Sequence, residues 1–116
     1  MKVLITGATG LVGQAIVSAL HEEGIQVNYL TTRKNQIRKE EDYQGYLWNP
    51  AKGEIDLDCF IGVNGIINLA GASIAKKWTS AHKKAVLASR VDSLNTLRKG
   101  LEQIKNTQIE SFVSAS

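Results

Sequence analysis

The sequence has one cysteine, one proline and 6% aromatic residues, and no apolar run approaches the roughly 20 residues that span a bilayer. A single thiol cannot form a disulfide within the chain, so Cys59 fits a reducing compartment, and we expect it in the core. The first residues also lack the basic start, apolar stretch and cleavage site of a signal peptide. We therefore predict a cytoplasmic protein without a membrane span.

Neither sign of charge dominates the chain. The 116 residues include 14 Lys and Arg against 11 Asp and Glu, for a formal net charge of +3, and the basic residues are mixed with acids. This pattern favours a local anion site over a nucleic-acid surface. Neither His21 nor His82 has the neighbouring ligands of a metal site, so we predict none. The length allows one domain, over 1–116.

Apolar periodicity indicates alternating strands and helices. Strands without clear alternation are typical of a sheet buried on both faces, whereas helices place apolar residues three and four positions apart. The pattern predicts strands at 2–6, 25–31, 43–48, 63–69 and 109–114, and helices at 11–23 and 79–104. Gly24 fits the position after the first helix, and Gly100 marks either the end of the second helix or a close packing contact. We expect a loop or short surface helix at 33–42 and a short amphipathic segment at 55–61.

The order of these elements predicts the fold class. Strands joined by helical connections run parallel with right-handed crossovers, which gives an open α/β sheet with helices on both faces. We predict a three-layer, Rossmann-type, doubly wound domain. Its strands, numbered along the chain, would lie in the order 3-2-1-4-5.

Three glycines mark the turn between the first strand and the first helix. A phosphate must approach the backbone closely at a helix N-terminus, where free N–H groups and the helix dipole favour an anion, and a Cβ would obstruct it. The first glycine permits the turn, the second admits the phosphates, and the third lets the helix pack on the strand. The dinucleotide-binding residues predicted here are Gly7, Thr9, Gly10, Leu11, Val12 and Gly13. A purely structural turn is the alternative.

The residues after the second strand indicate which dinucleotide is bound. An acid about 20 positions after the glycines would bind the ribose 2′-hydroxyl of NAD. The sequence instead reads Thr31-Thr32-Arg33-Lys34, with no carboxylate before Glu40. Because a cation suits the 2′-phosphate of NADP, we predict NADP, with NAD less favoured, bound by Thr32, Arg33 and Lys34. The alternative is that Arg33 and Lys34 are solvated loop charges.

These motifs resemble a known superfamily. The form T-G-x-x-G-x-x-G at 6–13, followed by N-L-A-G at the end of the fourth strand, resembles the short-chain dehydrogenases/reductases. The resemblance implies that the second segment flanks the ribose and nicotinamide side of the cofactor. Its residues are Asn68, Leu69, Ala70 and Gly71. A strand-end turn is the alternative.

Two further motifs point to one branch of that superfamily. I-A-x-x-W-T at 74–79 and S-R at 89–90 resemble the extended or atypical branch called nucleoside-diphosphate-sugar epimerase-like. Trp78 and Arg90 match recurrent positions there, but no catalytic role follows for them. A buried Trp anchor and an internal ion pair are the alternatives to a place beside the ligand.

The resemblance also implies a catalytic set. Members of the superfamily use a Ser or Thr after the fifth strand and a Tyr-x-x-x-Lys pair on the next helix, in which Tyr is the acid or base and Lys lowers its pKa. Ser116 is the implied hydroxyl, with Ser114 second. No tyrosine of this sequence is followed four residues later by lysine. We therefore expect the chain alone to be inactive.

Two interpretations of the whole chain remain. In the first, it is the N-terminal NADP-binding part of a longer epimerase or oxidoreductase, cut after the fifth strand, whose substrate is a sugar nucleotide or a small carbonyl or alcohol compound. In the second, it is a stand-alone NADP(H)-binding sensor or regulatory module. Flavin binding is a weaker third interpretation, and association into a homo-oligomer stays open.

Overall fold

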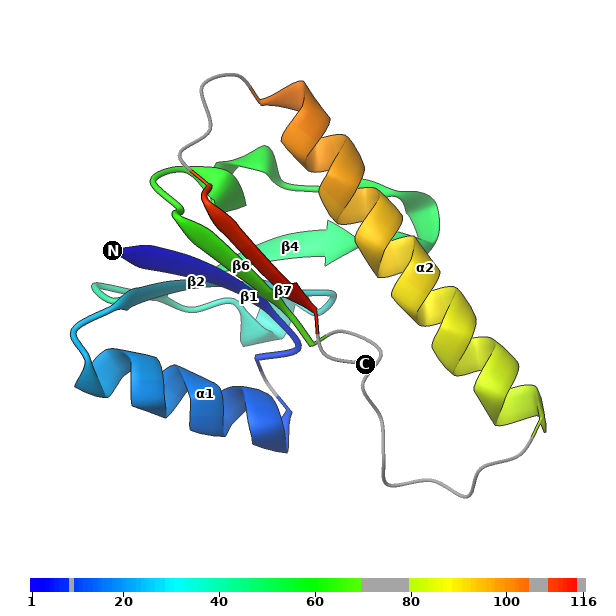
Figure 1. The fold of residues 1–116 in the computed structure, drawn as a ribbon, viewed down its shortest axis with the longest axis horizontal. Helices are drawn as coiled ribbons and strands as arrows, with labels where there is room; N and C mark the ends of the chain where they lie inside the picture. The colour runs from blue at the N-terminus through cyan, green and yellow to red at the C-terminus, as the bar shows by residue number, and fades with distance from the viewer. Residues whose placement is uncertain (9, 70–79, 105–108, 115–116) are drawn as a thin grey trace.

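The computed structural model describes residues 1–8, 10–69, 80–104 and 109–114 and contains a seven-stranded sheet (Figure 1). Its longer strands run parallel in the order β4-β2-β1-β6-β7, which is the predicted order 3-2-1-4-5. Their bounds are Lys2–Thr6 for β1, Gln26–Thr31 for β2, Tyr43–Asn49 for β4, Gly65–Asn68 for β6 and Ser111–Ser114 for β7. The predicted Rossmann-type fold class is confirmed.

Two short strands that the sequence pattern did not predict lie beside β4. They are β3 (Lys39–Glu40) and β5 (Glu54–Ile55), and both pair with β4 in the antiparallel sense. The segment 33–42, predicted as a loop or short helix, contains the 3₁₀ turn η1 (Lys34–Gln36) and then β3. A two-residue strand is too short to show a period, which is why the sequence gives no sign of it.

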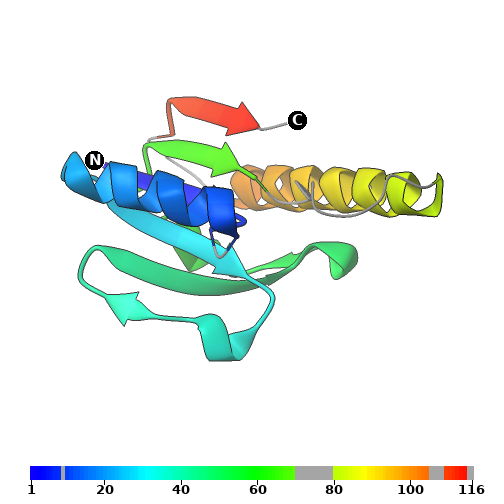
Figure 2. The same cartoon turned by 90° about the horizontal axis from the view of Figure 1, so that it is seen from below.

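One long helix covers each face of the sheet, as Figures 1 and 2 show. The helices are α1 (Leu11–Glu22) and α2 (Ser80–Gln103), so both match their predicted ranges to within one residue at each end. Two further 3₁₀ turns, η2 (Pro50–Lys52) and η3 (Leu57–Phe60), follow β4 and β5. The second of these lies in the segment predicted to be amphipathic.

Alternate residues along β1 enter two separate cores. Val3 and Ile5 pack with Val17 of α1, whereas Leu4 packs with Leu97 of α2. All of these side chains are buried. Burial on both faces explains why the strand is apolar without alternation, and it produces the three layers that were predicted.

Gly24 terminates α1, as its position predicts. It has a φ of +74°, its N–H donates to the carbonyl of His21 at 3.0 Å, and the N–H of Ile25 donates to the carbonyl of Leu20 at 3.0 Å. This pair of bonds satisfies the last carbonyls of the helix, and the left-handed backbone favours glycine. The chain therefore turns directly into β2.

Gly100 lies inside α2, which continues to Gln103, so it marks close packing and not the helix end. A Cβ built on Gly100 would lie 2.8 Å from Cε2 of Phe60 and 3.3 Å from Cγ2 of Ile55. Phe60 is itself buried. The missing side chain thus lets α2 approach η3 and β5 closely.

Candidate functional site

The predicted site residues that the structure describes lie at the carboxyl edge of the sheet. β1 lies between β2 and β6, with Thr6 opposite Leu30 on one side and Asn68 on the other. Asn68 is in turn paired with Ser114 of β7. The chain runs from β1 to β2 in one direction and later returns to β6 on the other side of β1. Open α/β sheets bind ligands at this kind of switch point.

Gly7 and Gly13 have no room for a side chain. Gly7 has a φ of +77°, and a Cβ there would lie 3.1 Å from the carbonyl carbon of Leu69. A Cβ on Gly13 would meet the backbone of the turn itself, 2.7 Å from Cα of Ala8, and would also overlap the carbonyl oxygen of Gly7. Both glycines are therefore required by the fold of the turn.

Gly10 is different, because nothing among the described residues requires a glycine there. Its φ is −76°, and the nearest atom to a Cβ would be the carbonyl oxygen of Gly7 at 3.5 Å, an ordinary contact. Its N–H donates to that oxygen at 3.2 Å, and its carbonyl accepts the N–H of Gln14 at 2.9 Å. Among the described residues, a Cβ would therefore be tolerated at Gly10.

The N-terminus of α1 carries no negative charge. No side chain caps the helix at Gly10, and its first turn contains no acidic residue. Leu11 and Val12, both predicted to contact the cofactor, are 88% and 56% exposed. The positive end of the helix dipole thus faces an uncapped, acid-free opening, which suits an anion.

Hydrogen bonds of the Thr6 side chain join the end of β1 to the end of β6. The Thr6 hydroxyl donates to Oδ1 of Asn68 at 2.5 Å, and the N–H of Leu69 donates to Oγ1 of Thr6 at 3.0 Å. Thr6 and Asn68 are 0% and 3% exposed. Sequence reasoning assigned Asn68 and Leu69 to the cofactor, whereas the structure also gives them a bond that fixes this edge of the sheet.

The loop after β2 places Thr32, Arg33 and Lys34 at the same edge. All three are exposed, and η1 begins directly after Arg33. The N–H of Arg33 donates to Oγ1 of Thr31 at 3.2 Å, which bends the chain out of the strand. The structure therefore brings the glycine turn, this basic loop and the end of β6 to one edge.

Several predicted residues lie outside the described part of the chain, or have side chains outside it. The backbone of Ser114 belongs to β7 and that of Arg90 to α2, but nothing is described of their side chains or of that of His82. The residues that lie outside altogether are Thr9, Ala70, Gly71, Trp78 and Ser116.

A cavity of about 670 Å³ beside the glycine turn was not predicted. It runs between α1 and the loop after β2, and its lining includes Ala8, Gln14, Arg38 and Tyr43. Burial, together with the neighbouring Tyr29, raises the pKa of the Tyr43 phenol. At neutral pH this phenol is protonated, so it adds no negative charge beside an anion site.

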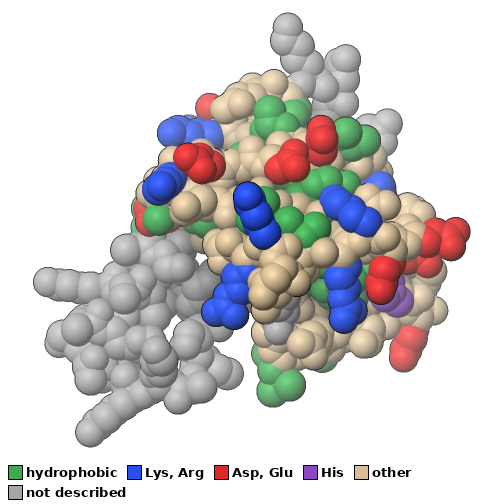
Figure 3. Space-filling model, turned by 180° about the vertical axis from the view of Figure 1, so that it is seen from behind, with side chains coloured by type: hydrophobic (Ala, Val, Ile, Leu, Met, Phe, Trp, Pro, Cys, Tyr) green, Lys and Arg blue, Asp and Glu red, His purple; other side chains and the backbone are tan. Residues whose placement is uncertain are grey.

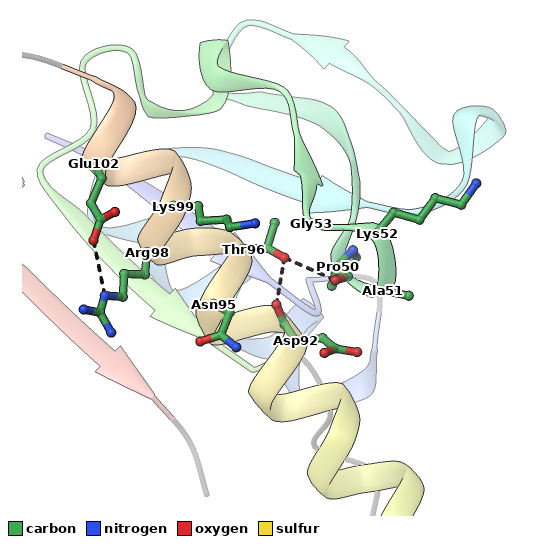
Figure 4. Close-up of a pocket in the computed structure, with 10 residues that line it drawn as sticks. All are labelled: Pro50, Ala51, Lys52, Gly53, Asp92, Asn95, Thr96, Arg98, Lys99 and Glu102. Atoms are coloured by element: carbon green, nitrogen blue, oxygen red, sulfur yellow. Dashed lines mark hydrogen bonds and ion pairs between the residues drawn. The ribbon is translucent and has the colours of Figure 1, made fainter.

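A second cavity, of about 510 Å³, lies between η2 and α2 and contains none of the predicted cofactor residues (Figure 4). Oγ1 of Thr96 lies 2.7 Å from the carbonyl oxygen of Asp92 and 3.3 Å from that of Pro50, while Arg98 and Glu102 form an ion pair at 3.3 Å. Only the contact with Pro50 joins α2 to the turn after β4, since the other two lie within α2, and the lining carries charges of both signs.

Other features of the described residues are structural. Cys59 is fully buried, as predicted, and burial raises the pKa of its thiol far above the ordinary value of 9.0, so it is no nucleophile. No group of three or more His, Cys, Asp and Glu within the described ranges could hold a metal ion. Neither α1 nor the described part of α2 has the length and apolar character needed to cross a bilayer. Figure 3 shows basic and acidic side chains interspersed on the face it draws.

Comparison with known proteins gives one family. The sequence profile of the NAD dependent epimerase/dehydratase family matches residues 3–116. An epimerase family protein of Staphylococcus epidermidis is 34% identical over 100 residues, which make up 83% of this chain and 31% of that protein. The chain thus spans less than a third of the length of this curated relative.

Solved structures agree on the fold. A human epimerase family protein, solved with NADPH, has a TM-score of 0.65 at 21% sequence identity. The match covers 98% of this chain and 36% of the human protein's chain. A short-chain dehydrogenase/reductase superfamily protein from Agrobacterium tumefaciens, with bound NAD, has a TM-score of 0.65 at 24% sequence identity. The match covers 100% of this chain and 32% of the chain of that protein.

The sheet order and the glycine turn define a Rossmann-type domain of the short-chain dehydrogenase/reductase kind. The chain belongs to the NAD dependent epimerase/dehydratase family, whose profile covers nearly its whole length. The predicted resemblance is confirmed.

Proposed function

We propose that this chain binds NADP(H) at the carboxyl edge of its sheet, with the pyrophosphate at the N-terminus of α1. The observation that carries the proposal is Gly10, which has an ordinary backbone and room for a Cβ but no side chain. A glycine that the fold does not require is explained by a ligand that must approach the backbone. The family, whose name specifies NAD, supports the binding of a nicotinamide dinucleotide at this site.

The preference for NADP(H) over NAD(H) rests on the loop after β2. Arg33 is exposed at the same edge of the sheet as the glycine turn, and neither Thr32 nor Lys34 supplies the acid that would bind a free ribose 2′-hydroxyl. One related structure was solved with NADPH and another with NAD, so the fold alone does not determine the choice of cofactor, and we assign that choice to this loop. A guanidinium and a 2′-phosphate form charge-assisted hydrogen bonds.

Titration of NADPH and NADH against the chain and its Arg33→Ala variant tests this proposal. We expect the chain to bind NADPH more tightly than NADH. Arg33→Ala should weaken the affinity for NADPH by about 10- to 100-fold and leave the affinity for NADH unchanged. Lys52→Ala is the matched control, since it removes an exposed cation that lines the separate cavity at η2. Equal affinity of the unaltered chain for both cofactors would contradict the preference, and binding of neither would contradict the site.

We further propose that the domain 1–116 is the nucleotide-binding part of a longer epimerase or reductase, which transfers hydride to or from an alcohol or carbonyl carbon of a sugar-like substrate. The relatives' greater length and the absence of Tyr-x-x-x-Lys from the sequence support this. Ser116, or Ser114, would orient the substrate oxygen, and the backbone of Ser114 lies beside Asn68 at the proposed site. This chain alone would then bind cofactor without turnover.

Location and partners complete the proposal. A lone, buried Cys59 fits the reducing cytoplasm. The partners would be the dinucleotide and, in the longer protein, a sugar nucleotide or small carbonyl compound, with self-association through an exposed strand edge.

A further inference from the structure

A buried phenol anchors the loop that carries Arg33. Tyr29 belongs to β2 and is 1% exposed. Its hydroxyl donates to the carbonyl of Gln36 at 2.6 Å and accepts the N–H of Arg38 at 2.7 Å. One side chain of the rigid sheet thus holds two backbone groups of the loop at once.

Gln36, whose carbonyl accepts the Tyr29 hydroxyl, is itself hydrogen-bonded to Arg33. The N–H of Gln36 donates to the carbonyl of Arg33 at 3.1 Å, which closes η1. On its other side, the N–H of Arg33 donates to the hydroxyl of Thr31 at 3.2 Å. The main chain of Arg33 is therefore connected to β2 in both directions, through Thr31 and through Tyr29.

The position of the Tyr29 ring is fixed by its neighbours in the sheet. A Cβ on Gly45 of β4 would lie 2.5 Å from Cζ of Tyr29, so only glycine leaves room for the ring. The ring stacks on Tyr43, with centroids 4.3 Å apart and planes at 20°. The N–H of Gly45 also donates to the carbonyl of Arg38 at 2.7 Å, which ties the far end of the loop to β4.

We infer that Tyr29 is a positioning residue for cofactor selection, because it fixes the loop that presents Arg33 to the 2′-phosphate. The inference rests on the proposed function and adds to it a residue that acts only through Arg33. A loop already held in its binding conformation loses less conformational entropy when it binds a ligand. Phenylalanine would fill the same space at position 29, so the hydroxyl and not the ring supplies the anchoring.

The test is the ratio of NADPH to NADH affinity in Tyr29→Phe. Loss of the two hydrogen bonds is expected to weaken the affinity for NADPH by about three- to tenfold, while the affinity for NADH should change by no more than about twofold. A purely structural defect would weaken both cofactors together. The control is Tyr43→Phe, which removes a hydroxyl from the same stacked pair without removing the bonds to Gln36 and Arg38, and it should leave the ratio unchanged.

Two further variants keep the test decisive. In an Arg33→Ala background, Tyr29→Phe should cause no additional change in the ratio, because the residue it positions is gone. Should Tyr29→Phe fail to fold, Thr31→Val removes the other hydroxyl that holds the main chain of Arg33, and it should lower the ratio of NADPH to NADH affinity. Thr31→Ser keeps a hydroxyl at this position and should leave that ratio unchanged.

The outcomes separate the two proposals. A loss of preference in Arg33→Ala together with an unchanged ratio in Tyr29→Phe overturns the role of Tyr29 and leaves the proposed function standing. An unaltered chain that shows no preference for NADPH overturns the proposed specificity and the role of Tyr29 with it. A lower ratio of NADPH to NADH affinity in Tyr29→Phe, with an unchanged ratio in Tyr43→Phe, supports both proposals.

Discussion

Gly10 and Gly13 belong to the same turn, yet a methyl group at each would meet different surroundings. At position 13 it would overlap backbone atoms of Gly7 and Ala8, which cannot move without opening the turn. At position 10 it would meet, among the described residues, only the carbonyl oxygen of Gly7 at 3.5 Å, an ordinary contact. Gly13 is therefore required by the fold of the turn, whereas Gly10 is explained by the proposed ligand.

We expect Gly10→Ala to fold and to lose cofactor, and Gly13→Ala to lose the fold. Gly13→Ala should lower the free energy of unfolding by about 3 kcal/mol or more because of overpacking against backbone. Gly10→Ala should lower it by no more than about 1 kcal/mol, as alanine is a poorer N-cap than glycine, yet weaken NADPH at least about tenfold. Chemical denaturation and cofactor titration measure the two effects, and tight NADPH binding by Gly10→Ala would refute the proposed placement of the pyrophosphate.

At the scale of elements, the contact between α2 and η3 depends on a glycine in the last turn of a helix. Glycine destabilises a helix interior relative to alanine by about 1 kcal/mol. At Gly100 this cost accompanies direct packing against the edge of the Phe60 ring, which is 5% exposed and held in the core on the α2 side of the sheet. Packing between elements therefore outweighs the local preference of the helix.

Gly100→Ala should consequently destabilise the protein despite its better helix propensity. The gain of about 1 kcal/mol in propensity is opposed by an overpacking cost of about 1–3 kcal/mol, for an expected net loss of about 1 kcal/mol. Asn95→Ala, at an exposed position of the same helix, isolates the propensity term and should be neutral or slightly stabilising. Both are measured by denaturant unfolding, and a stabilised Gly100→Ala would show that Phe60 can move aside.

At the scale of the whole molecule, the sheet ends at β7 with apolar side chains uncovered. Phe112 is 44% and Val113 is 57% exposed. They pair in register with Ile66 and Ile67, which enter the cores on the α2 and α1 sides respectively, so β7 presents an apolar residue toward each face. A parallel strand that is apolar on both faces is typical of the interior of a sheet, and an exposed edge of this kind favours association.

We expect the chain to self-associate as its concentration rises, through this edge. Val113→Lys should shift the chain toward monomer, because a charged edge residue disfavours strand pairing. Val91→Lys is the control, since Val91 is similarly exposed, at 54%, but lies on α2. Sedimentation velocity measures the effect. A chain that is monomeric throughout, or a Val91→Lys variant that acts as strongly, would exclude β7 as the interface.

Much of this architecture was predictable because it depends on local patterns. Periodicity gave the long strands and both helices, and Gly24 gave the end of α1, since each depends on neighbours a few residues away. β3 and β5 were missed because pairing with β4, and not any period of their own, makes them strands. The packing of Gly100 on Phe60 was left as one of two alternatives, since it joins residues far apart in the chain.

The sequence by itself determined the fold class, the family and the edge of the sheet where a cofactor would bind, because spaced glycines and apolar periods act through local backbone geometry. Only the tertiary structure decided which glycine the fold can spare, since that depends on the atoms facing each Cβ position. It also decided that Tyr29 holds the loop of Arg33. The bonds of its hydroxyl exist only where Gly45 of the neighbouring strand leaves room for the ring.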